Sequence, residues 1–325
     1  LCTVWDGSGP LPSDEAYVYF VPSDMRYPTM IIPRLQLPDA FIANPYEGIG
    51  QIFICDFQPE WPEASKMPLG CNVRSLGEVG NIAAETEALL TANNCNHLQF
   101  SEECMAPLQD FLGSIDGGEE LKGLGGSSNW QIPEAEIAKR RDFRDVRICT
   151  IDPPNAKDLD DALHICPVEG ETDVFEVGVH IADVSYFLAE DTALDREALT
   201  RATSVYLVQK VIPMLPPLLC EQLCSLNPNV DRLAFSCVWK MRGDGTLVDE
   251  KPWFGRSVIR SCAKLDYPTA QRMIDGDIPS VPDSGANADA FLTGLPEHVW
   301  EAKRRPIGQA AWALCKDVRM LHRCA

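Results

Sequence analysis

Short runs of aromatic and β-branched residues recur through residues 15–80, and each run is broken by Pro, Asp or Gly. Runs of this length and composition are typical of β-strands. Their close spacing predicts a small all-β unit, either a barrel or a sandwich. The expected strands lie at 16–22, 29–35, 40–43 and 50–57.

The pattern changes at residues 81–111, where Ala, Leu and Glu recur at helical spacing. A Gly- and Ser-rich stretch at 116–130 predicts a loop. A basic segment follows at 139–147 and contains five Lys and Arg residues. We therefore expect a helical and Gly-rich connector between the β-rich unit and the rest of the chain.

Strands and helices are mixed from residue 146 onwards, which favours an α+β fold. A hairpin is expected over 233–261 with its turn at 243–245, and a helix over 267–275 should end at Gly276. A Pro-, Gly- and Asp-rich loop is expected at 277–297, and an apolar helical pattern covers 310–321. The other predicted elements are strands at 146–151, 161–166 and 174–188, the last continuing into a turn, and a helix that begins near 192.

Composition limits the classes of protein that fit these elements. The 325 residues carry a formal net charge of -20, which argues against a protein that coats nucleic acid through its overall charge. The 13 cysteines are scattered, so free thiols in a reducing compartment fit better than a disulfide framework. No apolar run approaches the length of a membrane span.

Four aspartates lie within ten residues at Asp152, Asp158, Asp160 and Asp161. Packing like charges together opposes folding unless a cation compensates. Two prolines after Asp152 predict a turn that returns it toward the other three. In an extended segment Asp158 and Asp160 share one face and Asp161 takes the other, so convergence requires a local bend. Hard oxygen ligands of this kind suit Mg²⁺ or Mn²⁺.

Two alternatives to a catalytic metal site are a solvated acidic turn and a calcium-binding loop. Spacing alone favours the solvated turn, because clustered aspartates are common in exposed loops. The calcium loop fits poorly, since residues 152–163 lack the alternating ligands and closing Glu of an EF-hand. The apolar segments on both sides argue for a loop held between core strands.

Two tyrosines and three basic residues are candidates for contacts with nucleic acid. Tyr206 and Tyr267 could stack on bases, although the sequence without a family context favours ordinary core tyrosines. Arg256, Arg260 and Lys264 could contact phosphates, and the alternative is solvated surface charge.

His180 and Asp183 could form a catalytic pair, but sequence alone favours a buried histidine whose nitrogens are hydrogen-bonded.

Taken in order, residues 150–163, 177–188, 201–228 and 231–239 resemble the ribonuclease II (RNB) family and are most similar to its eukaryotic Dis-three-like branch. Residues 22–33 and 75–90 resemble the second cold-shock (OB) domain of these proteins. The resemblance implies an OB-like β-barrel at 1–80, a connector at 81–140 and the N-terminal part of an RNB catalytic domain at 141–325.

The resemblance also implies a function. It implies a processive, hydrolytic 3′→5′ exoribonuclease that degrades single-stranded RNA to 5′-nucleoside monophosphates, using Mg²⁺ or Mn²⁺. RNAs with a 3′-oligouridine tail are the expected substrates, and a monomer in the cytoplasm, including P-bodies, is the expected form. The competing hypothesis is an RNA-binding scaffold of the same family that lacks catalysis.

The resemblance also implies roles for individual residues that match positions in the family's motifs. Asp152, Asp158, Asp160 and Asp161 match its catalytic and metal-binding aspartates, and Tyr206 and Tyr267 match tyrosines near the RNA 3′ end. Arg256 and Lys264 are the expected additional RNA contacts. The family's catalytic domain continues past the position of Ala325 and supplies an arginine at the scissile phosphate, so residues 1–325 alone are expected to turn over weakly.

Overall fold

The computed structural model describes residues 1–4, 16–42, 45–61, 65–113, 130–248, 251–276 and 307–324. The chain divides into two compact units, Leu1–Gln99 and Phe100–Ala325. The loops predicted at 116–130 and 277–297 lie almost entirely outside the described residues. The two units are described separately below.

The first unit is built on one five-stranded sheet with strand order β3-β2-β1-β4-β5. Its adjacent strands pair antiparallel. A bridge between Ile31 and Leu69 brings β3 toward β5, so the sheet curls back on itself. The strands are β1 (Cys2–Val4), β2 (Tyr17–Pro22), β3 (Met30–Pro33), β4 (Gln51–Phe57) and β5 (Gly70–Glu78).

Short helices complete this unit, and one of them corrects a prediction. The strand expected at 40–43 is wrong, because Asp39–Ile42 forms helix α1 directly after Pro38. Helix α2 (Ile82–Ala92) begins at Asn81, whose side chain accepts hydrogen bonds from the backbone of Ala83 and Ala84. Two 3₁₀ turns, η1 (Arg34–Gln36) and η2 (Pro45–Gly48), lie between β3 and β4.

The second unit is a closed five-stranded barrel with strand order β11-β12-β6-β7-β8. β12 and β6 pair in parallel, and the other neighbours are antiparallel. The hairpin predicted at 233–261 is formed by the antiparallel neighbours β11 and β12. The strands are β6 (Arg141–Asp152), β7 (Asp161–Pro167), β8 (Val174–Ala182), β11 (Asp231–Arg242) and β12 (Trp253–Asp266).

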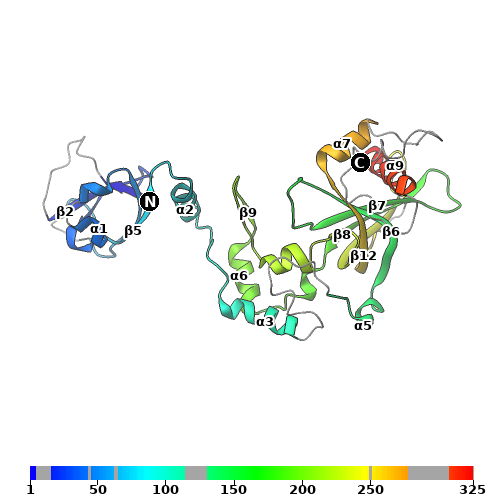
Figure 1. Ribbon diagram of the computed structural model, residues 1–325, viewed down its shortest axis with the longest axis horizontal. Coiled ribbons are helices and arrows are strands. Elements are labelled where there is room, and N and C mark those ends of the chain that lie inside the picture. The colour runs from blue at the N-terminus through cyan, green and yellow to red at the C-terminus, as the bar shows by residue number, and fades with distance from the viewer. Residues whose placement is uncertain are drawn as a thin grey trace. The chain divides into compact units, whose positions relative to one another are not determined.

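Helices pack around this barrel (Figure 1). α7 (Tyr267–Asp275) ends at Gly276 as predicted, and it packs against α9 (Ile307–Cys324). Gly276 has a left-handed backbone, which is typical of the residue that follows a helix. No helix among the described residues has both the length and the apolar character needed to cross a membrane. The remaining elements are α3 (Glu102–Gly113), α5 (Glu134–Ile137), η3 (Val184–Tyr186), α6 (Ala193–Arg201), β9 (Val205–Tyr206), β10 (Val211–Ile212), η4 (Leu218–Leu223), α7 (Tyr267–Asp275) and α9 (Ile307–Cys324).

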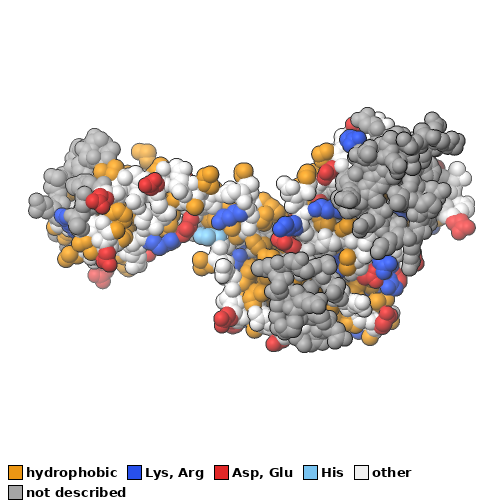
Figure 2. Space-filling model, viewed as in Figure 1, with side chains coloured by type: hydrophobic (Ala, Val, Ile, Leu, Met, Phe, Trp, Pro, Cys, Tyr) orange, Lys and Arg blue, Asp and Glu red, His pale blue; other side chains and the backbone are white. Residues whose placement is uncertain are grey.

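The segment expected to be a connector, 81–140, is shared between the two units. α2 packs on β4 and β5 of the first unit, whereas α3 packs on α6 of the second. Basic and acidic side chains are interspersed over the described residues on the face that Figure 2 shows.

Candidate active site

The four aspartates lie where two barrel strands meet a connecting loop. Asp152 is the last residue of β6 and is buried, and Asp161 is the first residue of β7. Asp158 and Asp160 belong to the loop between these strands. The required bend is therefore present, because the chain leaves one strand and enters its antiparallel neighbour within this segment.

A buried leucine anchors the acidic loop. Leu159, between two of the aspartates, is fully buried in the core of the second unit. Its N–H donates to the hydroxyl of Ser225 at 3.2 Å, and that hydroxyl donates to the carbonyl of Lys157 at 2.7 Å. Arg232 in turn donates to the backbone carbonyl of Ser225 at 2.9 Å. Leu159 therefore anchors the backbone of the loop in the core, whereas the side chains of Asp160 and Asp161 are exposed.

The anchors were not identified from sequence. Ser225 and Arg232 are distant in sequence from the loop, and nothing in their local pattern distinguishes them. Leu159 did carry a signal, because it is the one apolar residue within an acidic run and therefore a candidate for burial.

The aspartates interact electrostatically in the structure. Burial raises the pKa of Asp152, and the charges of Asp161 and Asp158 raise it further. Asp160 is exposed, but partial desolvation by the surrounding protein raises its pKa, with added repulsion from Asp158, Asp161 and Asp152. The fold thus places these carboxylates where they disfavour one another's ionised form, and a bound cation would relieve that cost.

The site fits a divalent cation, although its ligand atoms are not tightly gathered. No three of these aspartates have carboxylate oxygens within 4.8 Å of one another. One oxygen of the buried Asp152 has no hydrogen-bond partner. A buried, unpaired carboxylate oxygen beside further carboxylates is the donor set that Mg²⁺ prefers.

Tyr206 contacts this site directly. It lies in the short β9–β10 hairpin, and its hydroxyl donates a hydrogen bond to the carboxylate of Asp158. That hydrogen bond, together with burial, raises the pKa of Tyr206 to about 12. Its side chain is 63% exposed, so the ring face remains open to a ligand.

Tyr267 is also exposed and begins α7 next to Asp266, which lies opposite Asp152 in the β12–β6 register. The fold thus brings Tyr206 and Tyr267 to the same end of the barrel as the aspartates.

The three candidate basic residues have protein partners. Lys264 donates to the backbone carbonyl of Ala156 in the acidic loop. Arg260 binds Asp231 at 2.6 Å. Arg256 is half exposed and lies 3.8 Å from a carboxylate oxygen of Asp183. Lys264 is therefore part of the aspartate site, and its charge lowers the pKa of Asp152.

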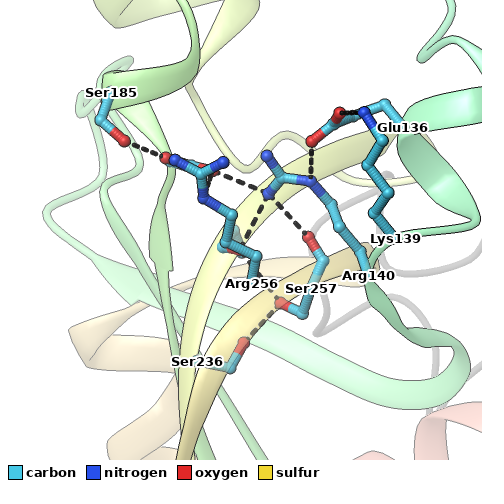
Figure 3. A network of polar contacts seen from close by, with 9 residues as sticks. Glu136, Lys139, Arg140, Ser185, Ser236, Arg256 and Ser257 are labelled. Carbon is cyan, nitrogen blue, oxygen red and sulfur yellow. Dashed lines mark hydrogen bonds and ion pairs between the residues drawn. The ribbon is translucent and has the colours of Figure 1, made fainter.

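His180 and Asp183 do not form a catalytic pair. The ring nitrogens of His180 contact His164 at 2.7 Å and Ser236 at 2.6 Å. Asp183 pairs with Arg140 at 2.7 Å, in a polar network that continues to Ser257 and Ser236 (Figure 3). The structure confirms the interpretation of His180 as a buried, hydrogen-bonded histidine.

Comparison with known proteins identifies the class of this fold. The RNB domain matches residues 140–325, and the Dis3-like cold-shock domain 2 matches residues 17–94. The chain therefore belongs to the RNB family, with an OB-like domain ahead of the RNB domain.

Within that family the chain is similar to proteins named DIS3-like exonuclease 2. It is 46% identical to the Xenopus tropicalis protein of that name, over 79% of this chain and 28% of the relative. An Arabidopsis thaliana relative named inactive exonuclease DIS3L2 is 39% identical over 81% of this chain and 23% of the relative. The chain thus spans about a quarter of the length of these relatives.

A solved structure has the same fold. Mycoplasma genitalium RNase R, in complex with ribose methylated single-stranded RNA, superposes with a TM-score of 0.64 over 90% of this chain and 40% of that chain, at 20% identity. The predicted α+β fold, an OB-like domain followed by an RNB domain, is confirmed.

Replacing Asp160 with Asn is expected to stabilise the metal-free protein slightly. A raised pKa in the folded state means that ionised Asp160 opposes folding above that pKa, whereas below the unfolded value both states are protonated. The gain at neutral pH should be about 0.5 kcal/mol, roughly 1–2 °C in Tm. It should disappear in acid, and added Mg²⁺ should stabilise the wild type more than the variant. Thermal unfolding in chelator and in Mg²⁺ measures this, and a lower Tm for the variant in chelator would contradict it.

Proposed function

We propose that the protein containing this chain is a processive, hydrolytic 3′→5′ exoribonuclease. Its substrate would be single-stranded RNA, and its products would be 5′-nucleoside monophosphates. The observation that supports this most directly is the set of four mutually repelling aspartates, with the unpaired, buried oxygen of Asp152 among them. The chain has an RNB domain and is similar to relatives named exonucleases.

Asp152, Asp158, Asp160 and Asp161 would hold Mg²⁺, with Mn²⁺ as an alternative. Bound divalent ions would supply a water of lowered pKa and stabilisation of the leaving oxygen. The protein's own contribution is positional. Leu159 and Ser225 hold the loop, and the Tyr206 hydroxyl fixes the Asp158 carboxylate. Lys264 adds a positive charge near Asp152.

The RNA 3′ end would lie against Tyr206 and Tyr267, whose rings are both exposed. Arg256, half exposed on β12, would contact the phosphate backbone. We propose 3′-oligouridylated RNA as the preferred substrate, as the resemblance to the Dis-three-like branch implies, and the chain is similar to relatives named DIS3-like exonuclease 2. We further propose that the protein is a monomer located in the cytoplasm, including P-bodies.

The ring of Tyr206, more than its hydroxyl, should determine RNA affinity. Tyr206→Ala is expected to weaken binding by roughly 5- to 150-fold, the equivalent of the 1–3 kcal/mol that stacking on one base contributes. Tyr206→Phe keeps the ring and loses only the hydrogen bond to Asp158, so its affinity should stay within about threefold of wild type. Fluorescence anisotropy with oligouridine, in an Asp160→Asn background that prevents degradation, measures both. Equal losses for the two variants would rule out stacking.

A second candidate function is an RNA-binding scaffold without catalysis. It is favoured by one observation, the similarity to a relative named inactive exonuclease. The presence of all four aspartates in one electrostatically coupled group favours the enzyme instead.

The test compares full-length protein with its Asp160→Asn variant on 5′-labelled oligouridine RNA in Mg²⁺. A processive 3′→5′ exonuclease should convert the RNA to a short end product without intermediates, and the variant should not. Binding by both proteins with degradation by neither would support the scaffold. Equal degradation by both would remove the aspartates from the mechanism.

A further inference from the structure

A chain of buried polar side chains crosses the interior of the barrel. Nδ1 of His164 on β7 lies 2.7 Å from Nε2 of His180 on β8. Nδ1 of His180 lies 2.6 Å from the hydroxyl of Ser236 on β11, which lies 2.6 Å from the hydroxyl of Ser257 on β12. Four of the five barrel strands thus contribute one member each. Buried polar groups in such a chain are normally satisfied throughout.

One nitrogen in this row of polar side chains lacks a hydrogen bond. Nε2 of His164 has no hydrogen-bond partner within 3.5 Å, although the residue is only 1% exposed, and a carboxylate oxygen of Glu176 lies just beyond that distance at 3.6 Å. Burial lowers the pKa of His164, and it lowers that of His180 to about 3, so both rings are neutral at neutral pH. If Nδ1–H of His164 donates to His180, Nε2 carries a free lone pair. A neutral imidazole oriented by a hydrogen bond from its other nitrogen is the usual form of a histidine metal ligand.

Two further ligand types lie beside that nitrogen. Cys166 is two residues beyond His164 on β7, so both side chains face the same side of the sheet. Glu176 on β8 is paired directly with Cys166, and its Oε1 lies 3.6 Å from Nε2 of His164. The imidazole nitrogen, the sulfur and a carboxylate oxygen all lie within 4.8 Å of one another. Among the described residues this is the one such group of three.

The cluster is separate from the aspartate site. Glu176 is six residues from Ala182, whose N–H donates to the carbonyl of Asp160 at 2.9 Å. Six residues of strand span about 20 Å. The two sites therefore lie toward opposite ends of β8, and their ligand chemistry also differs.

Nitrogen, sulfur and oxygen ligands together select a borderline-soft ion over Mg²⁺, and three protein ligands are the number found in zinc sites that keep one open position. Glu176 is already oriented from outside by Arg141, whose guanidinium lies 3.3 Å from Oε2. Arg141 is itself held over the rings of Phe143 and Trp253. We propose that His164, Cys166 and Glu176 form a zinc-binding site at the end of the barrel away from the aspartates, with the Cys166 thiol losing its proton to solvent on binding.

Cobalt reports on this site directly, because a cysteine thiolate bound to Co²⁺ gives a charge-transfer absorption band that carboxylate ligands do not give. The 325-residue chain, freed of metal with a chelator and kept in a non-thiol reductant, is titrated with Co²⁺ and then with Zn²⁺. We expect the band to saturate at one equivalent and to be abolished by Zn²⁺. Cys166→Ser should remove the band. Cys237→Ser, on β11 and outside the cluster, is the matched control and should keep it.

Glu176→Gln tests the remaining ligand. The variant should retain the band and weaken Co²⁺ binding by roughly 10-fold or more. Removing a residue that only hydrogen-bonds a metal ligand already costs about that much, so losing a ligand should cost at least as much. Far-UV circular dichroism establishes that each variant is folded. A wild-type chain without the band, or a band that survives in Cys166→Ser, would overturn the proposal. Oxygen-only binding at the aspartates would appear as Co²⁺ uptake without the band, and this outcome would also overturn it.

Discussion

Replacing Arg140 with methionine is expected to lower the free energy of unfolding by about 3–5 kcal/mol. The Arg140 side chain is fully buried and pairs with Asp183 and Glu136, each at 2.7 Å. It also reaches the backbone carbonyls of Ala234 and Ser257, so it joins the N-terminal end of β6 to β11 and β12 (Figure 3). Methionine keeps most of the volume and leaves the buried Asp183 carboxylate with the Ser185 hydroxyl and, as its only nearby positive charge, the more distant Arg256. Urea denaturation measures the loss.

The neighbouring residue supplies a matched control. Lys139 also pairs with Glu136, at 3.5 Å, but its side chain is 71% exposed. Lys139→Met should therefore change stability by less than about 0.5 kcal/mol. If the two substitutions cost the same, burial of the ion pair is not what stabilises this part of the barrel.

A second substitution separates the unpaired charge from lost packing. In the Arg140→Met background, Asp183→Asn removes the charge that was left buried. We expect the double variant to recover roughly 1–3 kcal/mol of the loss, a coupling typical of residues in direct contact. Additive effects of the two substitutions would show that Asp183 is already compensated by Arg256 and Ser185.

The burial of Arg140 could not be predicted from the sequence. It lies in a segment of five basic residues, and nothing local distinguishes it from Lys139. Burial of one and exposure of the other follow from the closure of the barrel, which depends on the parallel pairing of β12 with β6 across more than a hundred residues. Contacts between residues so far apart leave no periodic signal in either strand.

More of the aspartate site could be predicted from the sequence. Close spacing, the two prolines and the apolar flanks indicated a bent, anchored loop, and the structure has such a loop with Leu159 as its anchor. The resemblance placed Tyr206 near the RNA 3′ end, but its contact with Asp158 was not predicted, because the β9–β10 hairpin that carries Tyr206 is 48 residues away in sequence. The roles assigned to these residues in catalysis and RNA binding remain predictions.

The short helix α1 is an element that the sequence analysis predicted wrongly. Residues 40–43 look like a strand because they are apolar, but a run this short does not distinguish strand from helix. Pro38 and Asp39 favour the start of a helix, and the carbonyl of Pro38 accepts a hydrogen bond from Phe41. Capping residues were the better guide at this position.

Gly178→Ala is the second substitution expected to have a large effect. Gly178 lies on β8 opposite His164, and an added methyl group would overlap the His164 imidazole. The ring is buried and cannot move without breaking its hydrogen bond to His180. Overpacking costs typically 1–3 kcal/mol, and an unsatisfied buried nitrogen costs a similar amount, so we expect a loss of about 3–5 kcal/mol.

Gly243→Ala is the control for this effect, because a methyl group there would meet only the end of the exposed Asp173 side chain, which can turn away. Its cost should stay below about 1 kcal/mol. His164→Ala in the Gly178→Ala background should restore part of the stability, since it removes the atoms that overlap. A strand weakened simply by losing glycine would not respond to a change at His164. Urea denaturation measures the free energy of unfolding of the single and double variants. Recovery of stability in the double variant would show that the close approach of β8 to the buried histidine requires glycine at this position.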